Sequence, residues 1–435
     1  MTLAEVRLWG RTIGAVSLEA GETFASFQYD PAFAESGIEV SPLKMPLAKA
    51  PYRFPELAPA SFNGLPGMLA DSLPDRFGNA LIDAWLATQN RTPESFDAVE
   101  RLCYVGTRGI GALEFRPTLG PAPRTAKKIR VDALVELASE ILTHRNAISG
   151  SFVDDRRKEE ALKDILRVGT SAGGARAKAI IAWNRETGEV RSGQTDAGEG
   201  FEYWLLKFDG VAGNRDRELE DPHGYGRIEY AYSKMAAAAG INMSECQLLE
   251  ENGRCHFMTK RFDRRDDGSK LHMQSLAALA HFDYNMAGAY SYEQALGVVR
   301  RLGLGMDDIE QQFRRMAFNI VARNQDDHVK NIAFLMDKSG RWALSPAFDV
   351  TYSYNPSGAW TSKHQMTVNG RQDGFTHEDF RECARSAGMK RGRAEAIVEE
   401  VRAAVSRWRD YAAESGVPEA WAEQVRGNLR LEIPA

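Results

Sequence analysis

Three side chains that carry oxygen ligands are spaced as phosphoryl transfer requires. Asp326 is followed by Asn331 five residues later, and a second carboxylate, Asp349, comes eighteen residues after Asn331. In a phosphoryl-transfer site one carboxylate accepts the proton of the attacking hydroxyl, while an Asn and a further Asp hold magnesium against the nucleotide phosphates. We therefore predict a catalytic or metal-binding role for this trio.

The spacing of Asp326 and Asn331 matches the catalytic loop of protein kinases, although the His-Arg pair before the Asp is missing. The structural alternative is a polar helix end followed by a turn. Residues 307–322 carry apolar side chains at helical spacing, so the polar cluster is expected in a loop after a helix. Residues 332–336 and 342–344 are predicted strands of a hairpin, which would return Asp349 towards the other two.

Length and composition are those of a globular protein. The 435 residues suffice for two or three domains, and a formal net charge of −5 gives no general case for nucleic-acid binding. The four cysteines include no C-x-x-C pair, which argues against a zinc site or a disulfide framework. The sequence has no signal-peptide pattern and no apolar run of membrane-spanning length. We expect a cytoplasmic protein without a membrane partner.

Periodicity and chain breakers predict an α+β fold in three regions. Residues 1–117 form an α+β subdomain with helices at 79–88 and 94–104. Residues 118–270 begin with a linker, followed by helices at 131–143, 158–167 and 227–239 and strands at 179–183, 201–208, 247–250 and 256–262. Residues 271–435 are mostly helical, with a strand at 365–368 and final helices at 393–413 and 419–429.

A loop of small residues at 168–178 permits several interpretations. Gly169 and Gly174 have the spacing of a Walker A loop, but the Lys-Ser/Thr that should follow is missing. Ser171 lies in a G-x-S-x-G pattern typical of hydrolases, yet that elbow joins a strand to a helix, and here the predicted order is reversed. A third interpretation is a loop covering nucleotide phosphates, because glycine lets backbone N–H groups approach phosphate oxygens. The structural alternative is a tight turn.

Lys207 lies in an apolar strand, where an unpaired cation is costly. In a kinase such a Lys reaches the nucleotide phosphates and an acidic helix residue, and Glu229 is the candidate partner. The alternative is a strand-end Lys whose ammonium group extends to water.

Taken in order, these motifs resemble the HipA-like serine/threonine kinases, the toxins of type II toxin–antitoxin pairs, over nearly the whole chain. Residues 4–117, with Leu73-Pro74-Asp75, are similar to the family's N-terminal subdomain, which contacts the antitoxin. Residues 171–178 are similar to its serine-containing nucleotide loop, and 261–264 to the motif that connects its lobes. Residues 324–331 and 345–349 match its catalytic loop and its second metal-binding motif. The resemblance implies a protein-kinase-like bilobal fold with an N-terminal α+β subdomain, a kinase N-lobe-like region at 118–270 and a mostly helical C-terminal lobe at 271–435.

The resemblance also implies roles for the matched residues. Asp326 would be the general base, and Asn331 and Asp349 would hold Mg²⁺. Ser171 would be the residue that the kinase autophosphorylates to inactivate itself, because a phosphate adds about −1.5 to −2 charges beside the site for ATP phosphates. Thr170 is a second hydroxyl in that loop, and the sequence does not choose between the two. The residues implied to contact ATP are Gly173, Gly174, Ala175, Arg176, Ala177, Lys178, Lys207, Lys260, Arg261, Phe262, Gln274, His328, Lys330, Asn331, Phe348 and Asp349.

Three of these positions depart from the family's pattern. Arg176 and Ala177 stand where the type member has Gln and Glu, and Lys260 stands where an acidic residue occurs. Local contacts are expected to differ there, whereas the trio of Asp326, Asn331 and Asp349 is intact.

The resemblance implies partners as well. Family members are held by a helix-turn-helix antitoxin that binds operator DNA, so a HipB-like antitoxin and, through it, operator DNA are expected. The implied substrate is an aminoacyl-tRNA synthetase, whose phosphorylation inhibits translation. Two other functions stay open: a non-catalytic co-repressor in an antitoxin–DNA complex, and a serine hydrolase that uses Ser171.

Overall fold

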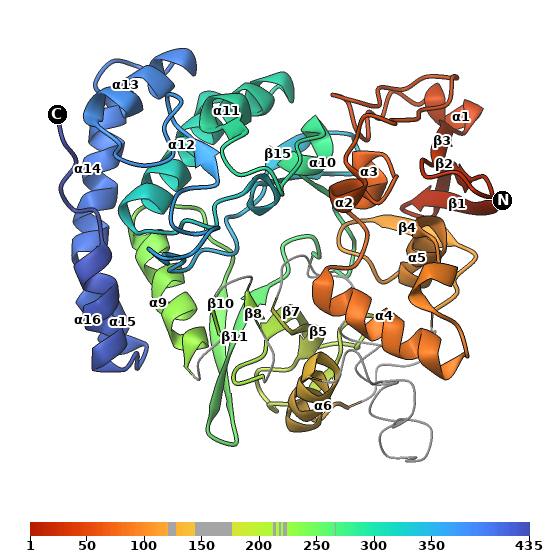
Figure 1. The fold of residues 1–435 in the computed structure, drawn as a ribbon, viewed down its shortest axis with the longest axis horizontal. Helices are drawn as coiled ribbons and strands as arrows, with labels where there is room; N and C mark the ends of the chain where they lie inside the picture. Colours follow the sequence, from red (N-terminus) through yellow and green to blue (C-terminus); the bar gives the residue numbers. More distant parts are fainter. Residues whose placement is uncertain (121–127, 144–175, 212–214, 217–218, 221–223, 266) are drawn as a thin grey trace. The chain divides into compact units, whose positions relative to one another are not determined.

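The computed structural model describes residues 1–120, 128–143, 176–211, 215–216, 219–220, 224–265 and 267–435 (Figure 1). It contains two compact units. Unit 1 comprises Met1–His223, Leu249–Gln274 and Met336–Arg341, and unit 2 comprises Gly224–Leu248, Ser275–Leu335 and Trp342–Ala435. Both units mix helices and strands, which confirms the predicted α+β class. The three-region division, with boundaries near 117 and 270, stays a prediction.

Two larger sheets lie in unit 1, apart from Cys246–Leu248 of one edge strand, which belong to unit 2. The first is antiparallel with the strand order β3-β2-β1-β4, and the second has the order β10-β11-β7-β5-β6. Along β1 every second side chain is buried, as expected for a strand with one face on a core. The strands are β1 (Thr2–Leu8), β2 (Arg11–Leu18), β3 (Ser26–Tyr29), β4 (Leu113–Arg116), β5 (Lys178–Trp183), β6 (Val190–Ser192), β7 (Glu202–Lys207), β10 (Cys246–Glu251), β11 (Arg254–Lys260) and β12 (His272–Ser275), with β8 (Arg215–Asp216) and β9 (Leu219–Glu220) as a separate pair.

The helices of unit 1 begin where side chains cap them. α4 begins after Asp75, whose carboxylate accepts a hydrogen bond from Gly78 N at 2.6 Å. The helix predicted at 94–104 begins later than expected, because Asp97 and Glu100 form a capping box in front of Ala98 and residues 93–95 form a separate turn. The helices are α1 (Pro31–Ala34), α2 (Pro59–Phe62), α3 (Gly67–Ala70), α4 (Arg76–Thr88), the 3₁₀ turn η1 (Pro93–Ser95), α5 (Ala98–Val105) and α6 (Val131–Thr143).

One apolar core joins α4 and α6 to the second sheet. It includes Phe77 of α4, Val135 of α6, Ile181 of β5 and Trp204 of β7, all of which are fully buried. β5 is buried along nearly its whole length. Its neighbours β6 and β7, together with the helices, hold it in place. Lys178 and Lys207 are direct cross-strand partners on β5 and β7, so this core fixes both lysines.

Unit 2 is mostly helical, as predicted. Within it α12 packs on α11 and α14, and α9 packs on α15 (Figure 1). Its helices are α9 (Tyr225–Ala238), α10 (Leu276–Ala280), α11 (Tyr292–Arg301), α12 (Met306–Val321), the 3₁₀ turn η2 (Val329–Asn331), α13 (His377–Ser386), α14 (Arg393–Ser406), α15 (Trp408–Glu414) and α16 (Glu419–Asn428). The strands are β13 (Tyr290–Ser291), β14 (Ala333–Met336), β15 (Trp342–Leu344) and β16 (Met366–Thr367).

The single helix predicted at 393–413 is wrong, because the chain turns at Arg407 between α14 and α15. The turn buries Trp408, whose indole N–H donates to Ala422 O at 2.9 Å and whose ring lies 5.1 Å from that of Tyr232. The break therefore lets one residue pack against both α9 and α16. The helix predicted at 158–167 lies outside the described residues. Among the residues described, no helix has the length and apolar character needed to cross a bilayer.

Candidate active site

The loop that carries Asp326 begins where α12 ends at Val321. Arg323 adopts a left-handed backbone conformation with φ 58°, which reverses the chain after the helix. Asn324 then donates twice to Asn319, from its backbone N to the carbonyl and from its side chain to the amide oxygen, both at 2.9 Å. These contacts tie the start of the loop to the last turn of α12.

The side chain of Asp326 is 24% exposed and lies at the surface of the loop. Its Oδ1 accepts a hydrogen bond from the indole N–H of Trp360 at 2.6 Å. Its Oδ2 faces His328 Nε2 at 3.9 Å, which is longer than a hydrogen bond. The backbone carbonyl of Asp326 accepts from the side chain of Asn331 at 2.9 Å. The Asp and Asn of the motif are thus joined directly.

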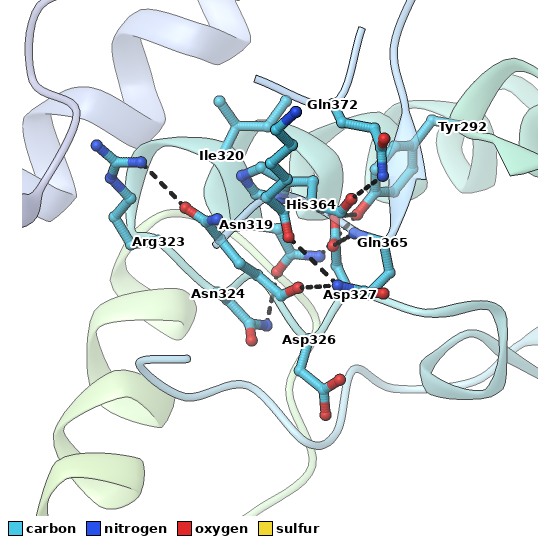
Figure 2. A network of polar contacts seen from close by, with 12 residues as sticks. Tyr292, Asn319, Ile320, Arg323, Asn324, Asp326, Asp327, His364, Gln365 and Gln372 are labelled. Carbon is cyan, nitrogen blue, oxygen red and sulfur yellow. Dashed lines mark hydrogen bonds and ion pairs between the residues drawn. The ribbon is translucent and has the colours of Figure 1, made fainter. Parts of the chain in front are cut away.

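The next residue, Asp327, is fully buried in a hydrogen-bond network, and Figure 2 shows its side chain pointing into that network while Asp326 points away. Its Oδ2 accepts from Tyr292 OH at 2.7 Å and lies 2.9 Å from His364 Nδ1, and its Oδ1 accepts from the backbone N of Gln365 at 2.8 Å. Burial alone would raise the pKa of Asp327, but the hydrogen bonds from His364, Tyr292 and Gln365 hold that pKa below its ordinary value. Asp327 is therefore an ionised anchor of the loop.

The tautomer of His364 follows from its other neighbour. Arg430 approaches His364 Nε2 with NH1 at 2.9 Å, and a guanidinium can only donate. Nε2 is therefore the acceptor, and Nδ1–H donates to Asp327. Arg430 also pairs with Asp373, so a chain of polar contacts runs from Asp327 to residue 430.

Gln325, which precedes Asp326, is held by the same stretch of chain. Its side chain donates to Thr361 O at 3.2 Å, and its carbonyl accepts from the side chain of Gln365 at 3.2 Å. The Gln365 amide also donates to Trp360 O at 2.6 Å. Residues 325–327 and 360–365 are consequently joined side by side.

A small cavity of about 20 Å³ in unit 2 brings two of the predicted metal ligands together. Asn331, Phe348 and Asp349 all line it. Asp349 has a left-handed backbone conformation, with φ 56°. The hairpin of β14 and β15 leads into this segment, and Ala347 N donates to Asn242 O at 2.8 Å. The structure thus places the Asn and the second Asp of the trio at one cavity.

The inner wall of the cavity is polar. It includes Gln312, which is 1% exposed, and Arg315, which is 7% exposed. Arg315 NH2 donates to Ser345 O at 2.6 Å, and burial lowers the pKa of Arg315 to about 10. Within the described chain neither amide atom of Gln312 has a hydrogen-bond partner. A cavity of this size and polarity suits about one water molecule.

In unit 1, Lys178 and Lys207 differ in their surroundings. Lys178 is 2% exposed and its Nζ lies 3.3 Å from Asp75 Oδ2, so it forms a buried ion pair. Lys207 is 6% exposed, and its Nζ lies 5.7 Å from the centre of the Phe257 ring. Glu229, its predicted partner, belongs to unit 2 and is 1% exposed.

The motif predicted to connect the lobes is a buried ion cluster in unit 1. Arg261 makes two contacts to Asp263, at 2.8 and 2.6 Å, and Arg264 NH1 makes a third at 2.7 Å. Burial opposes the charge of Asp263, but the two guanidinium groups and Gly111 N hold its pKa far below the ordinary value. The backbone N of Arg261 already donates to Tyr203 O at 2.9 Å. Lys260 extends to Glu202, 2.8 Å away.

Gln274 is fully buried in unit 1, and its amide donates to Val40 O at 2.6 Å. In unit 2, Lys330 stacks over the Tyr284 ring at 4.4 Å, and the His328 ring centre lies 6.3 Å from the same ring.

Models of known families match both halves of the chain. The HipA N-terminal domain matches residues 4–116, and the HipA-like C-terminal domain matches residues 170–408. The chain belongs to the HipA family. This HipA-family chain also matches a chain of the Shewanella oneidensis MR-1 toxin–antitoxin complex of HipA, HipB and operator DNA with a TM-score of 0.68 and 15% identity, over 98% of this chain and 94% of that one. At such identity the likeness shows a shared fold.

Two curated relatives come from Sinorhizobium fredii. "Putative kinase Y4mE" is 25% identical over 126 residues, and "Putative kinase Y4dM" is 27% identical over 140 residues. The matches span 27% and 28% of this chain, and only 30% and 32% of those relatives.

The predicted nucleotide loop of this HipA-family chain lies partly within the described residues. Arg176, Ala177 and Lys178 of the predicted nucleotide loop are described, and Phe208 N donates to Ala177 O at 3.0 Å beside that loop. Thr170, Ser171, Gly173, Gly174 and Ala175 lie outside the described residues. Their roles stay predictions.

Sequence patterns missed several residues that build the site. Asp327 was overlooked although it stands beside Asp326, because a pair of adjacent acids gives no sign of which one is buried. Tyr292, Trp360 and His364 lie in stretches without a catalytic motif, 35, 34 and 37 residues from their partners in the loop. A lone His followed by Gln, as at 364 and 365, was the only local signal.

Proposed function

We propose that this chain is an ATP-dependent serine/threonine protein kinase that acts as a toxin. The observation that carries the proposal is the arrangement of the trio. Asn331 is hydrogen-bonded to the backbone of Asp326 at 2.9 Å and lines the same cavity as Asp349. Phosphoryl transfer needs a carboxylate for the hydroxyl proton next to an Asn and Asp that bind metal.

Asp326 is the proposed general base. Its carboxylate is partly exposed, so a substrate hydroxyl can reach it, while Asp327 and Gln325 beside it are buried and hold the loop. The rigid support from both neighbours keeps the carboxylate in one orientation, which is a requirement for efficient proton transfer. His328 and Lys330 follow on the same loop and are proposed to lie along the nucleotide phosphates.

Asn331 and Asp349 are the proposed Mg²⁺ ligands, and their oxygens suit this ion. Magnesium in kinase sites takes one or two carboxylates and completes its shell with phosphate oxygens and water. Among the described residues no group of three or more His, Cys, Asp or Glu could hold a metal. When bound, Mg²⁺ would neutralise charge on the transferring phosphate.

The proposed contacts to ATP in unit 1 are residues 173–178, Lys207, the segment 260–262 and Gln274. Lys207 is proposed to contact a phosphate, because its compact ammonium charge is held at the buried end of β7. Gln274, whose buried amide donates to Val40 O, is proposed to lie near adenine.

We further propose the partners and targets typical of the family. The match to a chain of a HipA, HipB and operator DNA complex supports a helix-turn-helix antitoxin that carries the kinase to operator DNA. An aminoacyl-tRNA synthetase is the proposed substrate, and Ser171, or its neighbour Thr170, the proposed site of inactivating autophosphorylation. These events would take place in the cytoplasm.

Intact mass spectrometry tests the proposal. The purified protein is incubated with ATP and Mg²⁺, beside Asp326→Asn, and any added phosphate is mapped. Gain of phosphate by the wild type alone, at residue 170 or 171, is the expected result. If neither protein gains mass and none starts phosphorylated, candidate synthetases are added as substrates. Lack of transfer to these too would overturn the kinase assignment in favour of a co-repressor.

A further inference from the structure

The indole of Trp360 is hydrogen-bonded to the side chain of Asp326. Its N–H donates to Asp326 Oδ1 at 2.6 Å, although 34 residues separate the two in the chain. A neutral donor at this distance from a carboxylate forms a strong hydrogen bond and restricts the rotation of the carboxylate about its terminal bond.

The segment that carries Trp360 is fixed to the catalytic loop on both sides of Asp326. The Gln325 side chain donates to Thr361 O at 3.2 Å, and Asp327 Oδ1 accepts from Gln365 N at 2.8 Å. The carbonyl of Trp360 itself accepts from the Gln365 amide at 2.6 Å. Gln325, Gln365 and Asp327 are all buried. Three consecutive residues of the loop therefore each bind the segment 360–365.

We propose that Trp360 is a positioning residue for the general base. This inference rests on the proposed kinase function and adds a residue to it. By engaging Oδ1, the indole N–H fixes the plane of the carboxylate and assigns proton acceptance to Oδ2, the oxygen on the His328 side. Because Trp360 acts through the proposed base, its removal is expected to slow transfer without weakening the binding of ATP.

The chemistry of the step balances without a further reactant. The substrate hydroxyl gives its proton to Oδ2 of Asp326, its oxygen forms a bond to the γ-phosphorus, and the bond from that phosphorus to the bridging oxygen of ADP breaks. Trp360 keeps its own proton throughout. Its contribution is the orientation of the acceptor at the moment of attack.

The test distinguishes the effect of the indole N–H donor from the effect of the size of the ring. Trp360→Phe keeps an aromatic ring and removes the donor, while Trp360→Ala removes both. Trp421→Phe on α16, in the same unit, is the matched control because the hydrogen bonds described for the loop do not involve its indole. Single-turnover transfer from γ-labelled ATP with Mg²⁺ is measured in each full-length protein, and the affinity for ATP is measured by calorimetry.

We expect Trp360→Phe and Trp360→Ala to slow transfer to the same extent, by about tenfold to a hundredfold, since a hydrogen bond to a charged group of this kind changes rates on that scale. Affinity for ATP stays within about twofold of the wild type, and Trp421→Phe transfers at the wild-type rate. A second readout is the indole ¹H–¹⁵N signal of Trp360, which is expected to move in Asp326→Asn and to stay in place in Asp349→Asn.

Other outcomes overturn the inference. If Trp360→Phe transfers like the wild type and only Trp360→Ala is slow, the ring acts through packing. If Trp360→Phe is faster than the wild type, the indole restrains the base as an autoinhibitory contact. If an active wild type loses ATP binding with Trp360→Phe, the residue belongs to the nucleotide site. A wild type that transfers no phosphate, even to synthetases, instead refutes the proposed function itself.

Discussion

Asp327 and His364 form a buried pair at the centre of unit 2, with His364 Nδ1 2.9 Å from Asp327 Oδ2 and both side chains at zero exposure. Asp327 is the immediate neighbour of the proposed base. The pair therefore fixes the backbone from which Asp326 extends, without taking part in proton transfer. Support and the proposed chemistry are thus divided between two adjacent carboxylates.

Replacing Asp327 by Ala is expected to destabilise the protein strongly. Tyr292 OH, His364 Nδ1–H and Gln365 N–H would all lose their acceptor in a buried place. The expected loss of unfolding free energy is about 3 kcal/mol or more. Denaturant unfolding measures it, with Asp410→Ala as the control because Asp410 is 56% exposed and pairs with Arg407 at the surface. A control effect of at most about 1 kcal/mol is expected. Equal effects at both positions would contradict the anchoring role.

The protein is expected to lose stability as the pH falls, and part of this loss depends on Asp327. Its pKa in the folded protein is lowered from the ordinary value, so the stabilisation is present above the unfolded pKa of about 4 and is lost as pH falls through the folded value. Unfolding free energies of the wild type and Asp327→Asn are compared between about pH 3 and 6. The wild type should lose more stability towards the acid end. Asp263 has a strongly lowered pKa in both proteins and cancels in this difference. Parallel curves would refute the prediction.

Asp326→Asn is expected to remove phosphoryl transfer while leaving the fold and nucleotide binding intact. The carboxamide keeps the shape of the side chain and can accept from Trp360, but it cannot take the proton of a hydroxyl. Transfer from labelled ATP and calorimetry of ATP binding measure the two properties. Loss of ATP binding together with transfer would mean that Asp326 is structural.

We expect the two cross-strand lysines, Lys178 and Lys207, to have different functions. Lys178→Met leaves Asp75 without its ion-pair partner at 3.3 Å, and breaking a buried pair costs about 3 kcal/mol or more. Lys207→Met should weaken ATP binding by about tenfold or more, on the scale of one lost contact to a charged group. Unfolding and calorimetry on both variants give the comparison. A larger loss of ATP affinity in Lys178→Met than in Lys207→Met would reverse the assignment.

Two substitutions of Asp349 distinguish the effect of backbone strain on stability from the effect of the carboxylate on phosphoryl transfer. Its φ of 56° is left-handed, a conformation that Asn tolerates and that costs Ala roughly 1 kcal/mol. Asp349→Asn and Asp349→Ala should both lose Mg²⁺-dependent transfer, but the Ala variant should be less stable by about 1 kcal/mol. Thermal unfolding without nucleotide resolves the difference. Equal stability would show that the conformation carries no cost for Ala.

Sequence patterns predict elements well where contacts are local. The helix predicted at 307–322 is observed as Met306–Val321, because its apolar face repeats at helical spacing. The hairpin at 332–344 was predicted for a similar reason, since a turn of Asp, Lys, Ser and Gly separates two apolar runs. The break at Arg407 was missed because it depends on where Trp408 packs, on residues of α9 and α16.

The same distinction between local and long-range contacts applies to the residues of the candidate site. Asp326, Asn331 and Asp349 are predicted from a spacing that phosphoryl transfer requires, and their roles stay a prediction. The supports around them come from distant parts of the chain: Trp360 from a stretch without periodicity, His364 from an isolated position, and Arg430 from beyond α16. No local pattern encodes these pairings, because burial and direction decide them only after the chain has folded.

The contact between Arg430 and the loop has a consequence for the timing of synthesis. Arg430 follows Gln325 by 105 residues, and a ribosome adds roughly 5–20 residues per second. Residues 323–327 therefore leave the ribosome roughly 5 to 20 s before the guanidinium that completes their support. During that interval a nascent chain holds the proposed catalytic residues without the last link of the polar chain behind Asp327. The support behind the proposed catalytic loop of this HipA-family chain is therefore complete only after residue 430 has been made.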